Sequence, residues 1–128
     1  MADLTRLEQG IRDRLSEHRS LVDSLLSERE QIKGSLFARF AACGKATCAC
    51  AAGQKHGPYY VLSSRSGGSG AFVYLKEDQV SRVKELVERH RRFRKGLKRL
   101  KGLSVRLHDM FERYEDSAAR AGSRQAGI

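Results

Sequence analysis

Apolar residues recur along the first part of the chain at alternating spacings of four and three, the pattern of a helix with one apolar stripe. Six of the eight positions in this series are apolar. The series comprises Ile11, Leu15, His18, Val22, Leu25, Arg29, Ile32 and Leu36. Since no proline interrupts it, we predict one heptad-bearing helix over residues 3–40 of the N-terminal segment 1–40, with a break at Gly34 as the alternative.

A second series with the same spacing occupies the C-terminal part of the chain, and eight of its ten positions are apolar. It comprises Val83, Leu86, His90, Phe93, Leu97, Leu100, Ser104, Leu107, Phe111 and Tyr114. We therefore predict a second helix within residues 78–117. Two helices with one apolar stripe each must bury those stripes against each other or against a second copy of the chain. We expect an antiparallel, coiled-coil-like pair and a homodimer rather than a monomer.

Between the two series the period changes to that of β-strands. Residues 59–63 and 71–75 are rich in β-branched and aromatic side chains, and residues 66–70 are serine and glycine, which predicts a β-hairpin. We interpret the tyrosines of these strands, Tyr59, Tyr60 and Tyr74, as half-buried packing residues. The predicted fold class is mainly α with a small β-hairpin within residues 41–77, and residues 118–128 are expected to form a disordered tail.

All three cysteines lie in one short stretch together with a histidine, at Cys43, Cys48, Cys50 and His56. Thiolates and imidazole are the ligands that Zn²⁺ prefers, and four of them complete a tetrahedral shell with no position left for water. We therefore predict a loop that binds one structural zinc ion. Two alternatives stay open. The thiols could be small packing residues inside the loop, or they could serve a redox or iron–sulfur role, although an iron–sulfur cluster usually requires a fourth cysteine.

The net charge of +10 is unevenly distributed, and residues 78–128 alone carry +7. Eight of the thirteen residues from 89 to 101 are basic and none is acidic. These eight are Arg89, Arg91, Arg92, Arg94, Lys95, Lys98, Arg99 and Lys101. Cations so crowded repel one another, and phosphates would relieve that repulsion, so we predict that these residues bind nucleic acid. Lys45 and Lys55, beside the cysteines, are further candidates.

The basic run also admits two alternative roles. The acidic side chains of the first helix could neutralise it without any ligand; these are Asp13, Glu17, Asp23, Glu28 and Glu30. An anionic membrane surface is a less favoured partner, because the apolar stripe of the helix is already needed for helix pairing.

Several short motifs within residues 32–95 follow one another in a recognisable order. They are Gly34-Ser35-Leu36, Cys43-Gly44-Lys45, Cys48-Ala49-Cys50 and His56-Gly57-Pro58-Tyr59-Tyr60, followed by a glycine-rich turn and a long basic helix. In these motifs the chain resembles an uncharacterised family of short bacterial proteins with the pattern GSL, CGKxxCxC and HGPYY. The resemblance implies no established activity, but it implies a frequent association with mobile DNA. The chain departs from the pattern at Ala46-Thr47, where related chains often have Pro-Asn.

The sequence offers no paired carboxylates in a plausible pocket and no phosphate-binding loop, so we expect no enzyme activity. We predict a non-enzymatic, zinc-stabilised nucleic-acid-binding protein, with DNA favoured over RNA, that serves as an accessory factor of a mobile element. The alternative is a coiled-coil adaptor that docks on a larger recombinase or transposase. The N-terminus lacks an apolar signal segment and no apolar run approaches about 18 residues, so we expect a cytoplasmic protein without membrane contact.

Overall fold

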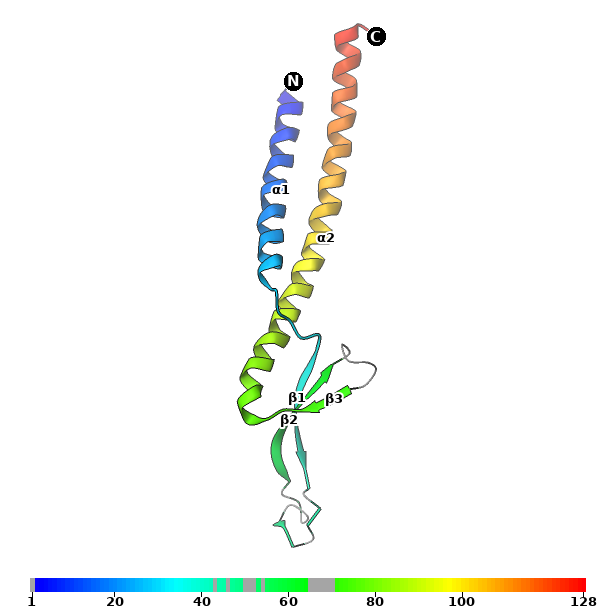
Figure 1. Cartoon of the computed structure of the whole chain (residues 1–128). Helices are drawn as coiled ribbons and strands as arrows, with labels where there is room; N and C mark the ends of the chain where they lie inside the picture. Colours follow the sequence, from blue (N-terminus) through cyan, green and yellow to red (C-terminus); the bar gives the residue numbers. More distant parts are fainter. Residues whose placement is uncertain (1, 43, 46, 50–52, 54, 65–70) are drawn as a thin grey trace. The chain divides into compact units, whose positions relative to one another are not determined.

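The computed structural model describes residues 2–42, 44–45, 47–49, 53, 55–64 and 71–128 (Figure 1). Its elements are helix α1 (Ala2–Ser27), strands β1 (Gly34–Ala41), β2 (His56–Ser64) and β3 (Ala71–Tyr74), and helix α2 (Glu77–Ala126). They form two compact units that divide within α2. The helix-pair unit comprises Met1–Glu28 and Phe93–Ile128, and the sheet unit comprises Arg29–Arg92. The predicted mainly helical fold with a small antiparallel sheet is confirmed.

In the helix-pair unit, α1 and α2 lie side by side and run in opposite directions (Figure 1). Near the start of α1, the Ser117 hydroxyl donates a hydrogen bond of 2.9 Å to Asp3 Oδ2. This hydrogen bond is the main reason that the pKa of Asp3 is lowered. Near the end of α1, Leu25 lies against Gly96. Because later residues of α1 meet earlier residues of α2, the helices are antiparallel.

The apolar stripe of α2 differs from the predicted series at alternate positions. Leu107 is buried as predicted, but three other predicted positions are exposed: Leu97, Ser104 and Phe111. The residues that face inward instead are Gly96, Leu103 and Met110. Gly96 supplies the physical reason, because a Cβ added there would lie 2.6 Å from Leu25 Cδ2. The helix turns its glycine toward α1, which brings the two backbones closer than a leucine would allow.

The corrected stripe makes a prediction about two leucines of the same helix. Leu103 is 5% exposed and Leu97 is 37% exposed. Leu103→Ala should lower the free energy of unfolding by about 2–5 kcal/mol, because it leaves a cavity between the helices. Leu97→Ala should lower it by less than about 1 kcal/mol. Urea denaturation followed by circular dichroism measures both, and equal losses would show that the stripe is placed wrongly.

The predicted helix over residues 3–40 was too long, because α1 ends at Ser27 and residues 34–41 form β1. The last turn of α1 contains no basic side chain to interact favourably with the helix dipole. Beyond it, β1 pairs with β2 from Gly34↔Ser64 to Ala41↔His56. The three–four spacing of apolar residues continues through Ile32 and Leu36, but residues 34–41 pair with β2 and form a strand instead of a helix.

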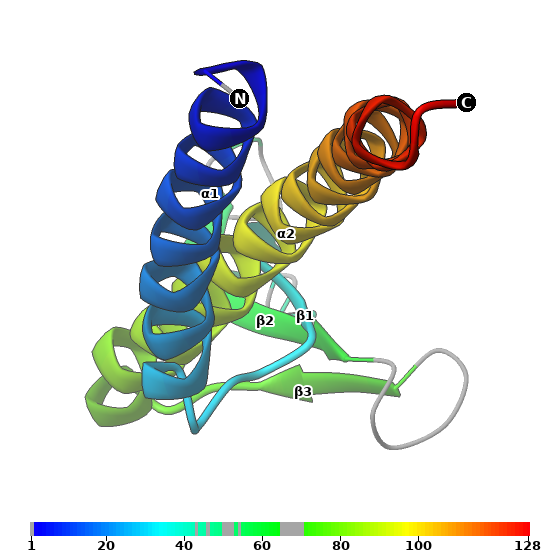
Figure 2. The ribbon, with the colours of Figure 1, turned by 90° about the horizontal axis from the view of Figure 1, so that it is seen from above.

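The sheet has three antiparallel strands in the order β1-β2-β3, one more than the predicted hairpin (Figure 2). The hairpin strands β2 and β3 pair as predicted, from Val61↔Tyr74 to Ser64↔Ala71. Most of its predicted turn, residues 66–70, lies outside the described residues. At the other end of the sheet a bulge interrupts β1 between Arg39 and Ala41. The additional strand leaves β2 in the centre, where Val61 is fully buried.

The predicted disordered tail was also wrong, since α2 continues as a helix to Ala126. Alanine has the highest helix propensity, and three alanines follow Ser117 at positions 118, 119 and 121. Ala118 and Ala121 line a shallow hollow with Leu4 of α1. Local propensity and contact with α1 together extend the helix past the end of the predicted stripe.

Within the described part of the chain, no helix combines the length and the apolar composition that a membrane span requires.

Candidate functional site

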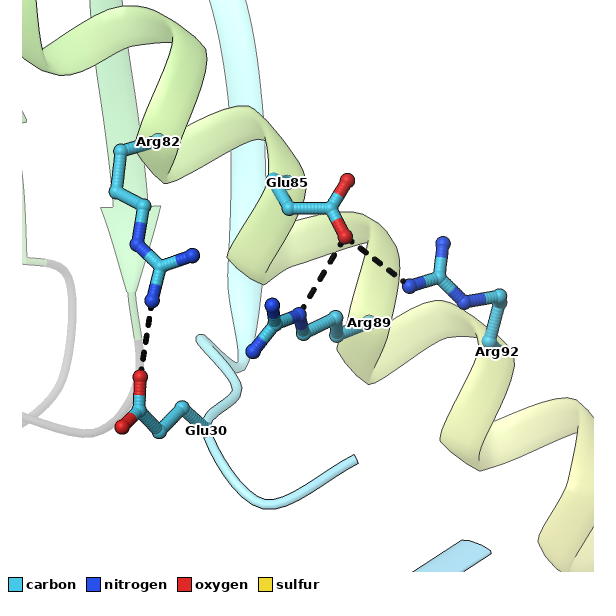
Figure 3. Close-up of polar contacts among 5 residues, drawn as sticks. All are labelled: Glu30, Arg82, Glu85, Arg89 and Arg92. Atoms are coloured by element: carbon cyan, nitrogen blue, oxygen red, sulfur yellow. Dashed lines mark hydrogen bonds and ion pairs between the residues drawn. The ribbon is translucent and has the colours of Figure 1, made fainter. Parts of the chain in front are cut away.

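Three of the eight basic residues in the run 89–101 form ion pairs with two acids of the same helix. Arg89 Nε and Arg92 Nη2 lie 3.4 Å and 3.2 Å from Glu85 Oε1 (Figure 3). Arg91 Nη1 lies 2.9 Å from Glu88 Oε1. Hydrogen bonds from Arg92 and then Arg89 lower the pKa of Glu85, so this carboxylate is charged at neutral pH. This end of the basic run is therefore partly neutralised by its own helix.

Neutralisation of the run by the N-terminal acids was the alternative to nucleic-acid binding, and the structure shows it in part. Glu17 Oε1 lies 3.2 Å from Arg99 Nη2, which joins α1 to α2 in the helix-pair unit. Glu30, in the sheet unit, instead pairs with Arg82 at 2.9 Å, outside the run (Figure 3). Acidic side chains therefore pair with only some of the cations in the run.

Four cations of the run have no acidic partner among the described residues: Arg94, Lys95, Lys98 and Lys101. All four are exposed, and they line one shallow hollow on α2 together with Leu97, Leu100 and Ser104. At about 100° per residue, Arg94, Lys98 and Lys101 point away from the face that carries Leu103 and meets α1. We call these four residues the cationic stripe. Its charge is uncompensated within the described chain and open to a ligand.

Two of the four predicted zinc ligands lie together. Cys48 Sγ is 3.1 Å from His56 Nε2, and both side chains are half-buried. His56 is the first residue of β2, so the sheet fixes the position of its backbone. Cys43 and Cys50 lie outside the described residues. The structure thus brings together a thiol and an imidazole that are eight residues apart in the sequence.

The Cys48–His56 pair lies at hydrogen-bond distance. Zinc binds sulfur at about 2.3 Å and nitrogen at about 2.0 Å, and tetrahedral angles then separate the two ligand atoms by about 3.6 Å. The observed separation of 3.1 Å between Cys48 Sγ and His56 Nε2 is that of a hydrogen bond, and the two atoms would have to move apart slightly to bind one ion. Lys45 and Lys55 are both exposed near this pair in sequence, and no ion pair engages either side chain within the described residues.

Gly57 follows His56 and is required by the backbone geometry at the start of β2. Its φ angle is +142°, a conformation that side chains other than glycine rarely adopt. A Cβ there would also lie 2.8 Å from the carbonyl oxygen of Arg39. Glycine at this position lets β1 and β2 approach each other beside the bulge, next to the candidate zinc ligand.

A second group of potential ligands was not expected from the sequence. His108, Asp109 and Glu112 place their ligand atoms within 4.8 Å of one another on α2, and His108 Nδ1 lies 2.9 Å from Glu112 Oε1. All three side chains are exposed. The spacing of four residues between His108 and Glu112 is the signal that could have revealed the contact. Exposed pairs of this kind are common on helices and do not by themselves indicate a function.

The sheet exposes aromatic side chains whose environment the sequence pattern did not reveal. Tyr59 and Tyr74, expected to be half-buried, are 43% and 57% exposed. Phe37 and Phe72, which were not among the predicted site residues, are 41% and 62% exposed. Large apolar side chains that stay in water on one small sheet are unusual, and they frequently mark a binding surface.

Comparison with known families gives one finding. A family model described as a domain of unknown function (DUF6788) matches residues 4–85. That range covers α1, the whole sheet and the first part of α2, including the Cys48–His56 pair, and it ends before the cationic stripe. Searches of curated proteins and of solved structures give no significant match.

Proposed function

Since the chain belongs to the DUF6788 family of domains of unknown function, we propose its function from its own geometry. It is a non-enzymatic DNA-binding protein in which α2 tracks the phosphate backbone and a zinc ion stabilises the loop before β2. The observation that carries this proposal is the cationic stripe of Arg94, Lys95, Lys98 and Lys101. These side chains are exposed and lack acidic partners among the described residues, although acids of α1 and α2 neutralise their neighbours.

The dimensions of the stripe suit a row of phosphates. From Arg94 to Lys101 an α-helix rises about 10 Å, and one strand of DNA carries a phosphate every 3.4 Å or so along the axis. Successive phosphates of one strand are farther apart than this axial rise, because the strand winds around the axis, so the stripe can face about two or three of them. Lysine and arginine side chains that reach phosphates fix position without reading bases, so the proposed binding is independent of sequence.

The proposed zinc ion would be held by Cys43, Cys48, Cys50 and His56. Four protein ligands leave no position for water or substrate, so the ion would stabilise the loop and would not catalyse a reaction. The support for it is the approach of Cys48 Sγ to His56 Nε2 at the start of β2. The family resemblance drawn from the sequence motifs favours DNA over RNA, and it suggests an accessory role for a mobile element.

The dependence of DNA affinity on salt tests the proposed function. If three phosphates are neutralised, the logarithm of the binding constant should fall linearly with the logarithm of salt concentration, with a slope of about −3. Two duplexes of equal length and different sequence should give the same slope and similar affinities. Fluorescence anisotropy with labelled duplexes measures both. An absence of binding at low salt would eliminate the proposal.

A second function, a coiled-coil adaptor for a recombinase or transposase, is favoured by a different observation. Leu15, Phe111 and Tyr114 line a groove between α1 and α2, and Leu15 and Phe111 are both exposed. The same groove could pair two copies of the chain, which is the homodimer we propose. Light scattering that gives a 14.4 kDa species at every concentration would eliminate the dimer. The adaptor function would lead if DNA binding were absent.

A further inference from the structure

One face of the three-stranded sheet collects most of its exposed aromatic residues. The register aligns Phe37 with Val61 and Val61 with Tyr74 across the three strands. Side chains alternate along a strand, so residues two positions away share this face. Val61 lies at the centre of this face and is buried, and around it lie Phe37, Arg39, Tyr59, Phe72 and Tyr74. We call these five residues the aromatic face.

The aromatic face is ordered although it is exposed. The rings of Phe37 and Phe72 meet edge to face, with centroids 6.3 Å apart and an angle of 84° between their planes. Arg39 Nη1 donates a hydrogen bond of 2.8 Å to Tyr74 Oη. Side chains from β1 and β3 thus lean on each other across β2. Side chains held in this way lose little further conformational freedom when a ligand binds.

The cation within the aromatic face and the net charge of the sheet unit that carries it favour an anionic ligand. Arg39 lies within this face, and the sheet unit as a whole contains twelve basic and five acidic residues, a net charge of +7. A second apolar surface would have to strip water from the Arg39 guanidinium, which costs free energy. A polyanion that also carries flat apolar rings matches both properties. Single-stranded nucleic acid is such a ligand, because its bases are free to stack on aromatic side chains.

We propose that the aromatic face binds single-stranded nucleic acid by stacking its bases on Phe37, Tyr59, Phe72 and Tyr74. Arg39 supplies a cation beside them, which contacts phosphate or stacks on a base. This inference rests on the proposed function and adds to it a preference for single strands, because in a duplex the faces of the bases are already covered by their neighbours. It concerns the sheet unit, whereas the cationic stripe belongs to the helix-pair unit.

Strand β3 provides a matched pair of variants for the test. Phe72 and Tyr74 lie on the aromatic face, while Val73 between them pairs with Leu62 on the opposite face. Phe72 is 62% exposed and Val73 is 49% exposed, so truncation of either side chain should leave the sheet folded. Circular dichroism and melting temperature check this directly for each variant.

The experiment measures the binding of the full-length protein to oligothymidylate, which has no stable secondary structure, and to a duplex of equal length. Phe72→Ala and Tyr74→Ala should each weaken single-strand binding by about 5- to 150-fold, because stacking on one ring contributes about 1–3 kcal/mol per base. Val73→Ala should leave it unchanged, and none of the three should alter duplex binding. The chain contains four tyrosines and no tryptophan, so quenching of tyrosine fluorescence by oligothymidylate gives a second readout of stacking.

The outcomes separate this inference from the proposed function. Equal affinities of wild type and Phe72→Ala for oligothymidylate, with duplex binding intact, would overturn the stacking surface and leave the cationic stripe in place. Failure of the wild type to bind either nucleic acid would overturn both. A change in oligomeric state with Phe72→Ala, but no change in single-strand affinity, would identify the aromatic face as a contact between copies of the chain and would also overturn the inference.

Discussion

Replacement of Arg94 and Lys98 together by glutamate is expected to lower the affinity of the protein for duplex DNA by about 100-fold or more. Each hydrogen bond between a charged side chain and phosphate contributes about 1.5 kcal/mol or more, so the loss of two corresponds to roughly 150-fold. Repulsion between the new carboxylates and phosphate adds to this loss. Both side chains are exposed and point away from α1, so the helix pair should keep its stability.

The control variant for this experiment lies on the same helix. Arg106→Glu with Arg113→Glu changes the net charge by the same amount, and both residues are exposed but lie outside the cationic stripe. This variant should bind DNA with only a small loss, which reflects the change in overall charge. If the two double variants lose the same affinity, the binding follows net charge and the stripe has no special role. If neither loses affinity, α2 is not the DNA-binding surface.

The purified protein is expected to contain about one zinc ion per chain, and removal of that ion should unfold the loop before β2. In zinc-finger peptides the apparent free energy of zinc binding is roughly 10–16 kcal/mol, which is large relative to the stability of most small domains. Addition of a strong chelator should therefore lower the melting temperature of the sheet unit. The helix-pair unit should be affected less, because its contacts, such as those of Leu103, are far from the cysteines in sequence.

Single substitutions test which residues hold the proposed zinc ion. Cys48→Ser and His56→Ala should each reduce the zinc content after dialysis well below one per chain, as measured by elemental analysis. His108→Ala should leave the content unchanged, because His108 belongs to the exposed group on α2. Protein that is purified without metal, and whose melting temperature is insensitive to chelator, would show that Cys48 and His56 form a structural contact only.

Periodicity predicted the existence of the helices and of the β2–β3 hairpin, because each pattern repeats over enough residues to be distinctive. It failed where two patterns overlap. Residues 29–36 continue the three–four spacing of α1, but residues 34–41 also suit a strand, and pairing with β2 decides between them. At the other end, the end of the apolar series near Tyr114 did not end the helix, because the alanines after Ser117 favour helix without any apolar stripe.

The candidate sites, like the fold, were predicted from the sequence only in part. The sequence identified all eight cations of the run, but only the fold separates the four of the cationic stripe from those that Glu85, Glu88 and Glu17 neutralise. Two of these acids lie three or four residues from their partners, a spacing visible in the sequence. The contact from Glu17 to Arg99 depends on antiparallel packing. The exposure of Phe72 and Tyr74 could not be predicted either, because alternation in a strand does not say which face is covered.

The glycine at position 96 also sets the direction in which α2 presents its charges. The predicted and the observed stripes of α2 share Leu100 and Leu107, so the helix has two rotational settings that would both bury leucines. They differ by roughly 50°, half of the 100° between successive residues. Close approach of Leu25 to Gly96 selects one of them. A larger residue at position 96 would favour the other setting, which would turn Arg94 and Lys101 toward the edge of the pair, so one missing side chain fixes the direction in which the cationic stripe faces.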